Sequence, residues 1–279
     1  MKNLLKLAIC QMKVLDNKKE NLTKATEQIR NAAAEKADFI VLPEMFNCPY
    51  ANSKFAEYGE SIEEGETVHT ISSLARELGV YITAGSIPEI SNGKLYNTSV
   101  TFDRKGLIIG VHRKLHLFDI HILGGITFRE SDTLASGNSI TIVDTEFCKI
   151  GVAICYDLRF PELFRIMALK GVKIVVVPAA FNTVTGPVHW EPLIRIRAID
   201  NQVYLAAVSP ARDESSEYQA YGNSMVVDPW GRILGQASEK EEMVCVNIDL
   251  ELVEKIRNEL PLLKHRRNDI YELVDKTMT

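Results

Sequence analysis

The chain contains few cysteines, and they are not spaced for pairing. Its 279 residues include five, at Cys10, Cys48, Cys148, Cys155 and Cys245. An odd, scattered set of this kind matches neither a disulfide framework nor a zinc-ligand spacing. We therefore expect no metal, and a reducing, cytoplasmic location.

Long apolar runs are also missing. No segment approaches the roughly 20 apolar residues that a membrane-spanning helix needs. Gln11 and Lys13 interrupt the apolar start early, and no small-residue cleavage pattern follows, so a signal peptide is not indicated. We expect no membrane partner.

Basic residues are fewer than acidic ones: the chain has 32 Lys and Arg and 37 Asp and Glu, for a formal net charge of -5. Because phosphate binding depends on clustered basic groups, this balance argues against a nucleic-acid partner. The basic run at 264–267 is short and suits a solvated helix end or a subunit contact. Gly124 and Gly125 lack the further glycine and the preceding strand of a phosphate-binding loop, so we expect no nucleotide cofactor.

Linkers and repeats are absent as well. No stretch rich in Pro, Gly and Ser, no charge block and no fixed period interrupts the chain. A composition of 46% hydrophobic and 25% charged residues is that of an ordinary globular protein. We predict one domain over residues 1–279, because the candidate catalytic residues below are spread along the chain and a division would separate them.

What the chain does contain is an alternation of apolar strands and amphipathic helices. Strands are predicted at 5–12, 39–42, 80–86, 99–103, 107–112, 140–143, 150–154, 173–177, 203–209, 224–227 and 243–248. Helices are predicted at 22–33, at 68–78 before Gly79, after Pro161, and at 189–201. These strands are too many for one open sheet, whereas two stacked sheets covered by helices use them all.

Cys155 stands where an apolar strand gives way to a helix. Val152 and Ile154 belong to the strand, and Pro161 suits the first turn of the helix. Backbone N–H groups near such a turn can hold an anion, and a nearby helix start is expected to lower the thiol pKa. Cys155 is therefore a candidate nucleophile, although a free cysteine in this place can also be a small buried hydrophobe.

Two further apolar strands end in a single ionisable group. Glu44 follows one of them, where partial desolvation should raise its pKa toward the range of a general base. Lys114 follows the other and offers a fixed positive charge for an oxyanion. None of the six histidines forms an obvious relay with Cys155. Either residue alone could be a solvated loop residue, so the hypothesis depends on all three together.

The same segments carry a family resemblance. Leu42-Pro-Glu44, His112-Arg-Lys114 and the stretch from Cys155 to Glu162, in this order, resemble the Glu-Lys-Cys triad of the nitrilase superfamily of carbon-nitrogen hydrolases. The resemblance covers nearly the whole chain. It implies an α/β fold, the four-layer α-β-β-α sandwich of two stacked mixed sheets flanked by helices. It also implies a homodimer or a larger homo-oligomer, paired through the helices that follow the nucleophile and the C-terminal segment.

Other segments are similar to one branch, the omega-amidases. This branch hydrolyses the terminal amide of 2-oxoglutaramate, 2-oxosuccinamate, succinamate and similar short dicarboxylic monoamides. The matching segments are 46–50, 117–119, 126–131, 181–182, 185–191, 200–204 and 209–213. The loop at 121–125 differs in detail between members, and because it borders the pocket it bears on substrate preference.

The mechanism that the resemblance implies agrees with the chemistry of these residues. Glu44 accepts the proton of Cys155, the thiolate attacks the amide carbonyl, and Lys114 and the backbone N–H of Tyr156 hold the oxyanion. Protonated Glu44 then supplies the proton of the departing ammonia and later activates the water that opens the thioester. Through the resemblance alone, Glu130 is a second glutamate that bonds near the lysine and positions the triad or the substrate.

Recognition of the substrate is less defined. A carboxylate on the substrate calls for a cation or several donors. Arg159 is a candidate, although we favour for it an ion pair with Glu162 or Asp157. The resemblance adds pocket candidates that can equally be core residues, namely Tyr50, Phe118, Phe181 and Thr183. It also adds His189, which with Trp190 could line the pocket or simply cap and pack.

Two other functions remain open. A different superfamily member would act on an N-carbamoyl compound, a peptide-like amide or a nitrile with the same triad and another pocket. A catalytically idle binding protein would keep only the fold, and the presence of all four catalytic candidates argues against it. A metal-dependent amidase has no support, since no cluster of His, Asp and Glu has ligand spacing.

Overall fold

Two stacked sheets form the centre of the molecule. The computed structural model describes residues 3–124 and 126–278; Gly125 of the loop at 121–125 lies outside them. The first sheet has seven strands in the order β15-β1-β2-β3-β5-β4, with β6 also paired to β5. They are β1 (Leu4–Gln11), β2 (Phe39–Val41), β3 (Tyr81–Thr83), β4 (Ile87–Ser91), β5 (Lys94–Phe102), β6 (Ile108–Arg113) and β15 (Glu242–Asp249).

The second sheet has six strands in the order β14-β13-β12-β11-β10-β9. They are β9 (Thr141–Asp144), β10 (Lys149–Val152), β11 (Val172–Pro178), β12 (Tyr204–Val208), β13 (Met225–Val227) and β14 (Ile233–Gln236). Both sheets contain parallel and antiparallel pairs, such as β1 with β2 and β1 with β15. Both are therefore mixed sheets.

Strand periodicity explains why the sheets stack. Along β1, Leu5, Leu7 and Ile9 pack into the cluster between the sheets, whereas Ala8 and Cys10 face the helices outside. Successive side chains of a strand point to opposite faces, so a strand that is apolar on both faces must be covered twice. β11 and β12 alternate in the same way.

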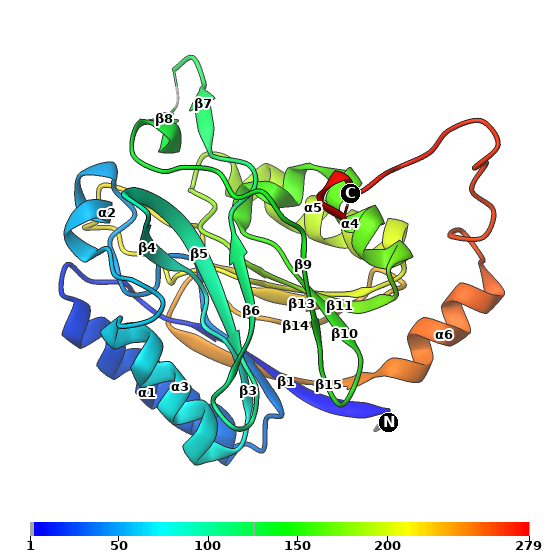
Figure 1. Ribbon diagram of the computed structural model, residues 1–279, viewed down its shortest axis with the longest axis horizontal. Coiled ribbons are helices and arrows are strands. Elements are labelled where there is room, and N and C mark those ends of the chain that lie inside the picture. The colour runs from blue at the N-terminus through cyan, green and yellow to red at the C-terminus, as the bar shows by residue number, and fades with distance from the viewer. Residues whose placement is uncertain (1–2, 125, 279) are drawn as a thin grey trace.

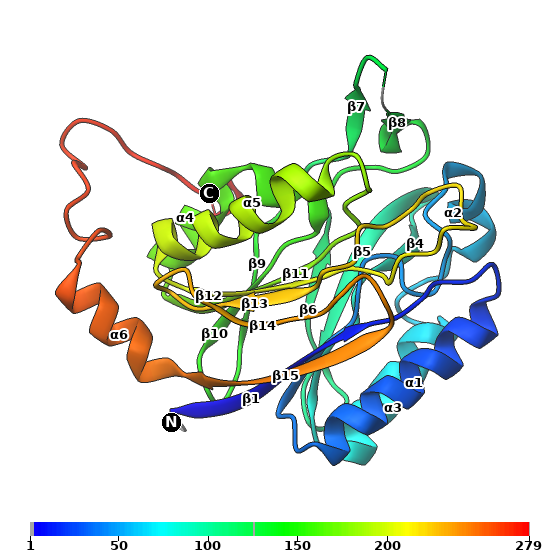
Figure 2. The ribbon, with the colours of Figure 1, turned by 180° about the vertical axis from the view of Figure 1, so that it is seen from behind.

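Helices supply the two outer layers. α1 (Lys18–Ala34) and α3 (Glu66–Leu78) cover the first sheet, and α4 (Pro161–Leu169) and α5 (Gly186–Asn201) cover the second, as Figures 1 and 2 show from opposite sides. The predicted four-layer sandwich is confirmed. α3 ends at Gly79 with φ 65, because glycine enters the left-handed region without the steric cost of a side chain.

The elements that the sequence did not delimit are short or exposed. They are α2 (Asn52–Tyr58), β4, the hairpin of β7 (Asp119–His121) and β8 (Thr127–Arg129), β14, and α6 (Leu250–Glu259). The hairpin projects from the body near α2 (Figure 1). Beyond α6 the chain swings away and returns to the α4 and α5 layer (Figure 2). In the part of the chain that the structure describes, no helix is both long and apolar enough to cross a membrane.

Candidate active site

Glu44 is held by a tight backbone contact just beyond β2. A Cβ atom on Gly85, whose φ is +47, would lie 1.9 Å from the carbonyl oxygen of Pro43. On the other side of Glu44, Met45 has φ 50, and its N–H donates to Ser86 Oγ at 3.0 Å. Only glycine allows so close an approach. The Glu44 side chain therefore projects from a closely restrained turn and is fully buried.

Lys114 follows β6 directly and meets Glu44 from the neighbouring part of the sheet. Its Nζ donates to Glu44 Oε1 at 2.9 Å, to Glu130 Oε1 at 2.9 Å and to the Tyr50 hydroxyl at 3.3 Å. The side chain is fully buried. Burial alone would lower the pKa of Lys114, but the charges of Glu130 and Glu44 outweigh burial and raise it. The ammonium is therefore a permanent positive charge.

Glu130 completes this buried group, although in the sequence it looks like a loop charge. It follows β8, and the β7–β8 hairpin turns the chain back so that Glu130 faces the residues preceding β7. Its Oε2 accepts from the Phe118 N–H at 2.6 Å, and its Oε1 accepts from the Tyr50 hydroxyl at 2.7 Å. A buried carboxylate needs such partners to offset desolvation. The resemblance thus located a residue that local pattern did not.

Cys155 lies on the second sheet, where β10 leads into a 3-10 turn (Cys155–Arg159) before α4. Its φ is 45, in the left-handed region that residues with side chains rarely adopt and that recurs at nucleophile turns. Sγ accepts a hydrogen bond from the Ala180 N–H at 3.5 Å, and the residue is 3% exposed. The strand-to-helix turn was predicted; its backbone strain was not.

The pKa values of Cys155 and Glu44 both rise. Burial and the negative charge of Glu44 raise the pKa of the Cys155 thiol, and Lys114 only partly opposes them. The predicted lowering by a helix start is wrong, because burial dominates at this turn. Burial also raises the pKa of Glu44, against the effect of Lys114, as the sequence predicted. The resting thiol is neutral, so it needs a base in contact with it.

Glu44 has one oxygen engaged and one available. Oε1 accepts from Asn97 Nδ2 at 2.8 Å as well as from Lys114. Oε2 is buried without a well-aligned donor among the described residues. The nearby Cys155 thiol lowers the pKa of Glu44, and Glu44 in turn raises the pKa of Cys155. Oε2 is therefore the oxygen open to the thiol proton.

Asp157 joins the cysteine turn to the lysine strand. Its Oδ2 lies 3.2 Å from His112 Nε2 and accepts from the Ile154 N–H at 3.0 Å. Its Oδ1 lies 2.7 Å from His116 Nδ1 and accepts from the His116 N–H at 3.0 Å. Burial alone would raise the pKa of Asp157, but bonds from His112 and His116 hold it well below its usual range. This carboxylate fixes the two catalytic segments relative to each other.

A narrow slot lies at Cys155, and its walls leave almost no free volume in this structure. It is lined by Phe118, Cys155, Tyr156, Arg159, Ala180, Phe181, Thr185 and Tyr218. Four of the predicted substrate-binding residues, Phe118, Tyr156, Arg159 and Phe181, are in this lining.

The other three lie elsewhere. Tyr50 belongs to the charged group behind the slot, and Thr183 is outside the lining, where Thr185 stands instead. His189 is exposed, and its Nδ1 lies 3.2 Å from Arg159 Nη1. Its neighbour Trp190 is a core residue, buried against Phe181 with ring centroids 5.0 Å apart.

Arg159 does not form the ion pair that the sequence favoured. No carboxylate among the described residues lies within 4.0 Å of its guanidinium, since Asp157 bonds to the histidines instead. The guanidinium lies over the Phe181 ring, 4.9 Å from its centroid, and 5.7 Å from that of Tyr156. It is therefore a cation at the slot without a protein counter-ion in the described chain.

Asn97, Ala180 and Tyr218 were missed as site residues. Asn97 lies within β5, Ala180 follows β11, and Tyr218 lies in the irregular segment between β12 and β13. Each meets the site through contacts with residues far away in sequence. No local pattern signals such contacts.

Comparison with known proteins agrees with this geometry. The model of the carbon-nitrogen hydrolase family matches residues 6–258. The chain belongs to the carbon-nitrogen hydrolase family. This hydrolase is 46% identical over 271 residues to omega-amidase NIT2 of Xenopus tropicalis, covering 97% of this chain and 98% of that protein. It is 46% identical over 266 residues to human omega-amidase NIT2, covering 95% and 96%.

Solved structures of the superfamily share the fold. Nit3 of Saccharomyces cerevisiae, described as a member of branch 10 of the nitrilase superfamily, superimposes with a TM-score of 0.88 at 42% identity, covering 96% of this chain and 98% of that one. The NitFhit protein of C. elegans gives 0.89 at 33% identity, covering 98% and 67%. The predicted membership of the nitrilase superfamily, in the branch similar to omega-amidases, is confirmed, and the chain is an amidase of that superfamily.

Proposed function

We propose that this amidase is an omega-amidase that releases ammonia from the terminal amide of 2-oxoglutaramate, 2-oxosuccinamate and succinamate. The observation that carries the proposal is the arrangement at the slot. Cys155 stands in the lining with the buried charges of Glu44 and Lys114 behind it, and Arg159 is a cation without a counter-ion in the same lining. A monoamide of a dicarboxylic acid carries an amide at one end and a carboxylate at the other, which matches these two features.

The first half of the reaction forms a thioester. Glu44 Oε2 takes the thiol proton as Cys155 Sγ bonds to the amide carbon, so the thiolate forms only as the attack occurs. The developing oxyanion accepts hydrogen bonds from Lys114 and from the Tyr156 N–H. Lys114 can turn to it by giving up its longest bond, that to the Tyr50 hydroxyl at 3.3 Å. Glu44 then gives the proton to the nitrogen, the C–N bond breaks and ammonia leaves.

The second half returns the enzyme to its first state. Glu44, again ionised, takes a proton from a water molecule, whose oxygen bonds to the thioester carbon. The C–S bond breaks, the acid is released, and the proton returns to the sulfur. Glu130 and Asn97 hold Lys114 and Glu44 in place throughout, which keeps one base in position for both steps.

Arg159 is the proposed partner of the substrate carboxylate. Its planar guanidinium can donate two parallel hydrogen bonds to a carboxylate. Phe118 and Phe181, which both line the slot, are the proposed apolar contacts of the substrate's carbon chain. His189, beside Arg159, orients the guanidinium from the surface. The substrate thus spans the short distance between a nucleophile and a cation.

Ammonia release tests the proposal. Wild type and Cys155→Ala are assayed on 2-oxoglutaramate and succinamate, with glutamine, an N-carbamoyl amino acid and an aliphatic nitrile alongside. We expect release from the first two alone, lost in the variant. Release only from another compound would assign the enzyme to a different branch, and no release at all would favour an idle protein of the same fold.

The proposal includes a homodimer, formed through the α4 and α5 layer and the returning C-terminal segment. Leu169 of α4 and Ile196 of α5 are 39% and 41% exposed, and Ile270 of the segment is 68% exposed. Apolar side chains in such a group mark an interface. Sedimentation of wild type and Ile270→Asp distinguishes a dimer from a monomer. We also propose that residues 1–279 form a single domain, because each sheet contributes part of the site. The proposed location is the cytoplasm.

A further inference from the structure

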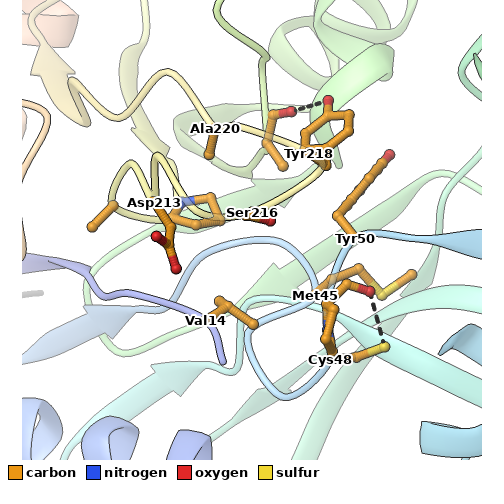
Figure 3. Close-up of a pocket in the computed structure, with 12 residues that line it drawn as sticks. Val14, Met45, Cys48, Tyr50, Asp213, Ser216, Tyr218 and Ala220 are labelled. Carbon is orange, nitrogen blue, oxygen red and sulfur yellow. Dashed lines mark hydrogen bonds between the residues drawn. The ribbon is translucent and has the colours of Figure 1, made fainter. Parts of the chain in front are cut away.

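A second cavity lies directly behind the slot. It is small, with a volume of about 30 Å³, and has Met45, Cys48 and Tyr50 on one side and Asp213 and Ser216 on another (Figure 3). Two residues, Ala180 and Tyr218, line both this cavity and the slot at Cys155. The Tyr218 ring is therefore a wall between two spaces.

This wall is anchored on several sides. The Tyr218 hydroxyl donates to the Ala180 carbonyl at 2.5 Å, the bond drawn in Figure 3. Its ring centroid lies 4.5 Å from that of Tyr50 and 5.9 Å from that of Phe128. The next residue along, Gln219, accepts from the Thr183 N–H at 3.2 Å. A ring held in this way leaves the slot closed toward the cavity.

The Tyr218 ring lies on the same side of the site as Glu44. Met45, which lines the cavity, directly follows Glu44. Tyr50, whose ring packs against that of Tyr218 at a tilt of 34°, bonds through its hydroxyl to Glu130 and Lys114. Burial raises the pKa of Tyr218, and so does its closeness to Cys155 and Glu44. In the proposed reaction Glu44 protonates the departing nitrogen, so that nitrogen must face this side.

We propose that Tyr218 is a specificity-determining residue that restricts the leaving group to ammonia, because its ring occupies the space that a substituent on the amide nitrogen would need. This inference rests on the proposed function. When the thioester C–S bond forms and the C–N bond breaks, the proton from Cys155 passes through Glu44 to the nitrogen. A primary amide then releases ammonia, whereas an N-alkyl amide must release a longer amine toward the ring. Primary amides are hydrolysed, and N-alkyl amides are not.

Removal of the ring joins the slot to the cavity. The space vacated by the ring, with Met45 and Cys48 beside it, then offers an N-alkyl chain apolar contacts, although Asp213 and Ser216 also line the cavity. Wild type, Tyr218→Phe, Tyr218→Leu and Tyr218→Ala are assayed for succinate release from succinamate and from N-propylsuccinamate. The measured quantity is the ratio of kcat/KM for the two amides, which cancels a general loss of activity.

Wild type and Tyr218→Phe should hydrolyse succinamate only, because both keep the ring. In Tyr218→Ala the ratio of N-propyl to primary amide hydrolysis should rise by about tenfold or more, the usual discrimination of a pocket that excludes a methylene or more. Tyr218→Leu should raise the ratio less, and it serves as the test if thermal unfolding shows that the Ala variant is not folded.

If Tyr218→Leu and Tyr218→Ala both have the wild-type ratio of kcat/KM for the N-propyl and primary amides, the inference is overturned. It is also overturned if wild type hydrolyses the two amides at similar rates. Failure of wild type on succinamate, with hydrolysis of another primary amide, would instead defeat the omega-amidase proposal. The ratio is then measured on that amide and its N-propyl derivative, so the role of Tyr218 is decided separately.

Discussion

The two ends of the slot are built differently. At the catalytic end, Glu44, Lys114 and Glu130 have no exposed surface, and hydrogen bonds from several strands and loops hold them. At the recognition end, Arg159 is half-buried and His189 is exposed, with a single hydrogen bond between them. The chemistry depends on a preorganised buried network, whereas recognition depends on side chains that can be substituted with little loss of stability. The superfamily is thus easier to identify than the substrate.

The largest effect is expected from removing the buried ammonium. Lys114→Met leaves Glu44 and Glu130 buried beside each other without a counter-ion, so the free energy of unfolding should fall by roughly 3–5 kcal/mol. Activity should fall by at least about 10²-fold, since a charge facing the oxyanion is lost. Urea unfolding and ammonia release measure both. Lys94→Met, at an exposed position, is the control, and an equally stable Lys114→Met would show that the network does not depend on this charge.

At the catalytic end of the slot, Glu44→Gln should reduce activity without reducing stability. We expect activity to fall about 10²- to 10⁴-fold without a loss of stability. Because the folded-state pKa of Glu44 is raised, the folded protein binds this proton more tightly than the unfolded chain does. The resulting contribution to the free energy of unfolding is lost in wild type as the pH rises above the unfolded-state pKa. Glutamine does not ionise, so the variant should gain stability relative to wild type between pH 4 and pH 8.

Urea unfolding at the two pH values and a rapid-quench assay test this prediction. Glu63→Gln, at an exposed position, should change neither result. A normal first-turnover burst in Glu44→Gln would show that another group is the first base.

Asp157→Asn tests the connection between the cysteine and lysine segments. The bonds to His112 and His116 are weakened, and we expect the free energy of unfolding to fall by about 1–3 kcal/mol at neutral pH. The folded-state pKa of Asp157 is lowered, so its contribution is present above the unfolded-state pKa and is lost as the pH falls. The difference in unfolding free energy between variant and wild type should therefore stay nearly constant from neutral pH down to about pH 4 and shrink at about pH 2.5, as measured by urea unfolding.

A deficit that stays constant with pH would mean that the charge of Asp157 does not matter. Asp144→Asn, exposed at the end of β9, is the matched control. It should unfold like wild type at both pH values.

The smallest effect on stability is expected at the recognition end. Arg159→Gln should change the free energy of unfolding by no more than about 0.5 kcal/mol. KM for succinamate should rise by roughly tenfold or more, from the loss of a charge-assisted bond, while butyramide, which has no carboxylate, should be unaffected. An equal rise for both amides would exclude Arg159 as the carboxylate partner. Arg159→Lys keeps the charge and should recover part of the loss.

The same contrast explains what could be predicted from the sequence. The central strands of the two sheets, such as β1, β11 and β12, are apolar on both faces, so the pattern and number of strands led to a stacked arrangement. Lys114 follows its strand directly, Glu44 and Cys155 come within three residues of the end of theirs, and the structure brings the three positions together. Glu130 has no local signal and came only through the resemblance. The roles of these four residues stay a prediction until the variants are measured.

What could not be predicted depends on tertiary contacts. The Cys155 pKa was argued from a neighbouring helix start, yet burial between packed layers decides its direction. Arg159 was expected to pair with Glu162 or Asp157, but Asp157 bonds instead to His112 and His116, which come from the strand β6 of the other sheet and the residues after it. Tyr218 comes from an irregular segment, where no periodicity indicates which way a side chain points. Each of these outcomes is set by residues distant in the chain.

The pairing of β1 with β15 has a consequence for synthesis on the ribosome. β1 lies between β2 and β15, with Leu4 opposite Asp249 and Gln11 opposite Glu242. Until residue 249 has emerged, one edge of β1 lacks its hydrogen-bonding partner. Unpaired strand edges are prone to association, and contacts between such distant residues form slowly. We expect nascent chains to remain inactive and dependent on chaperones long after Glu44 and Cys155 have been made.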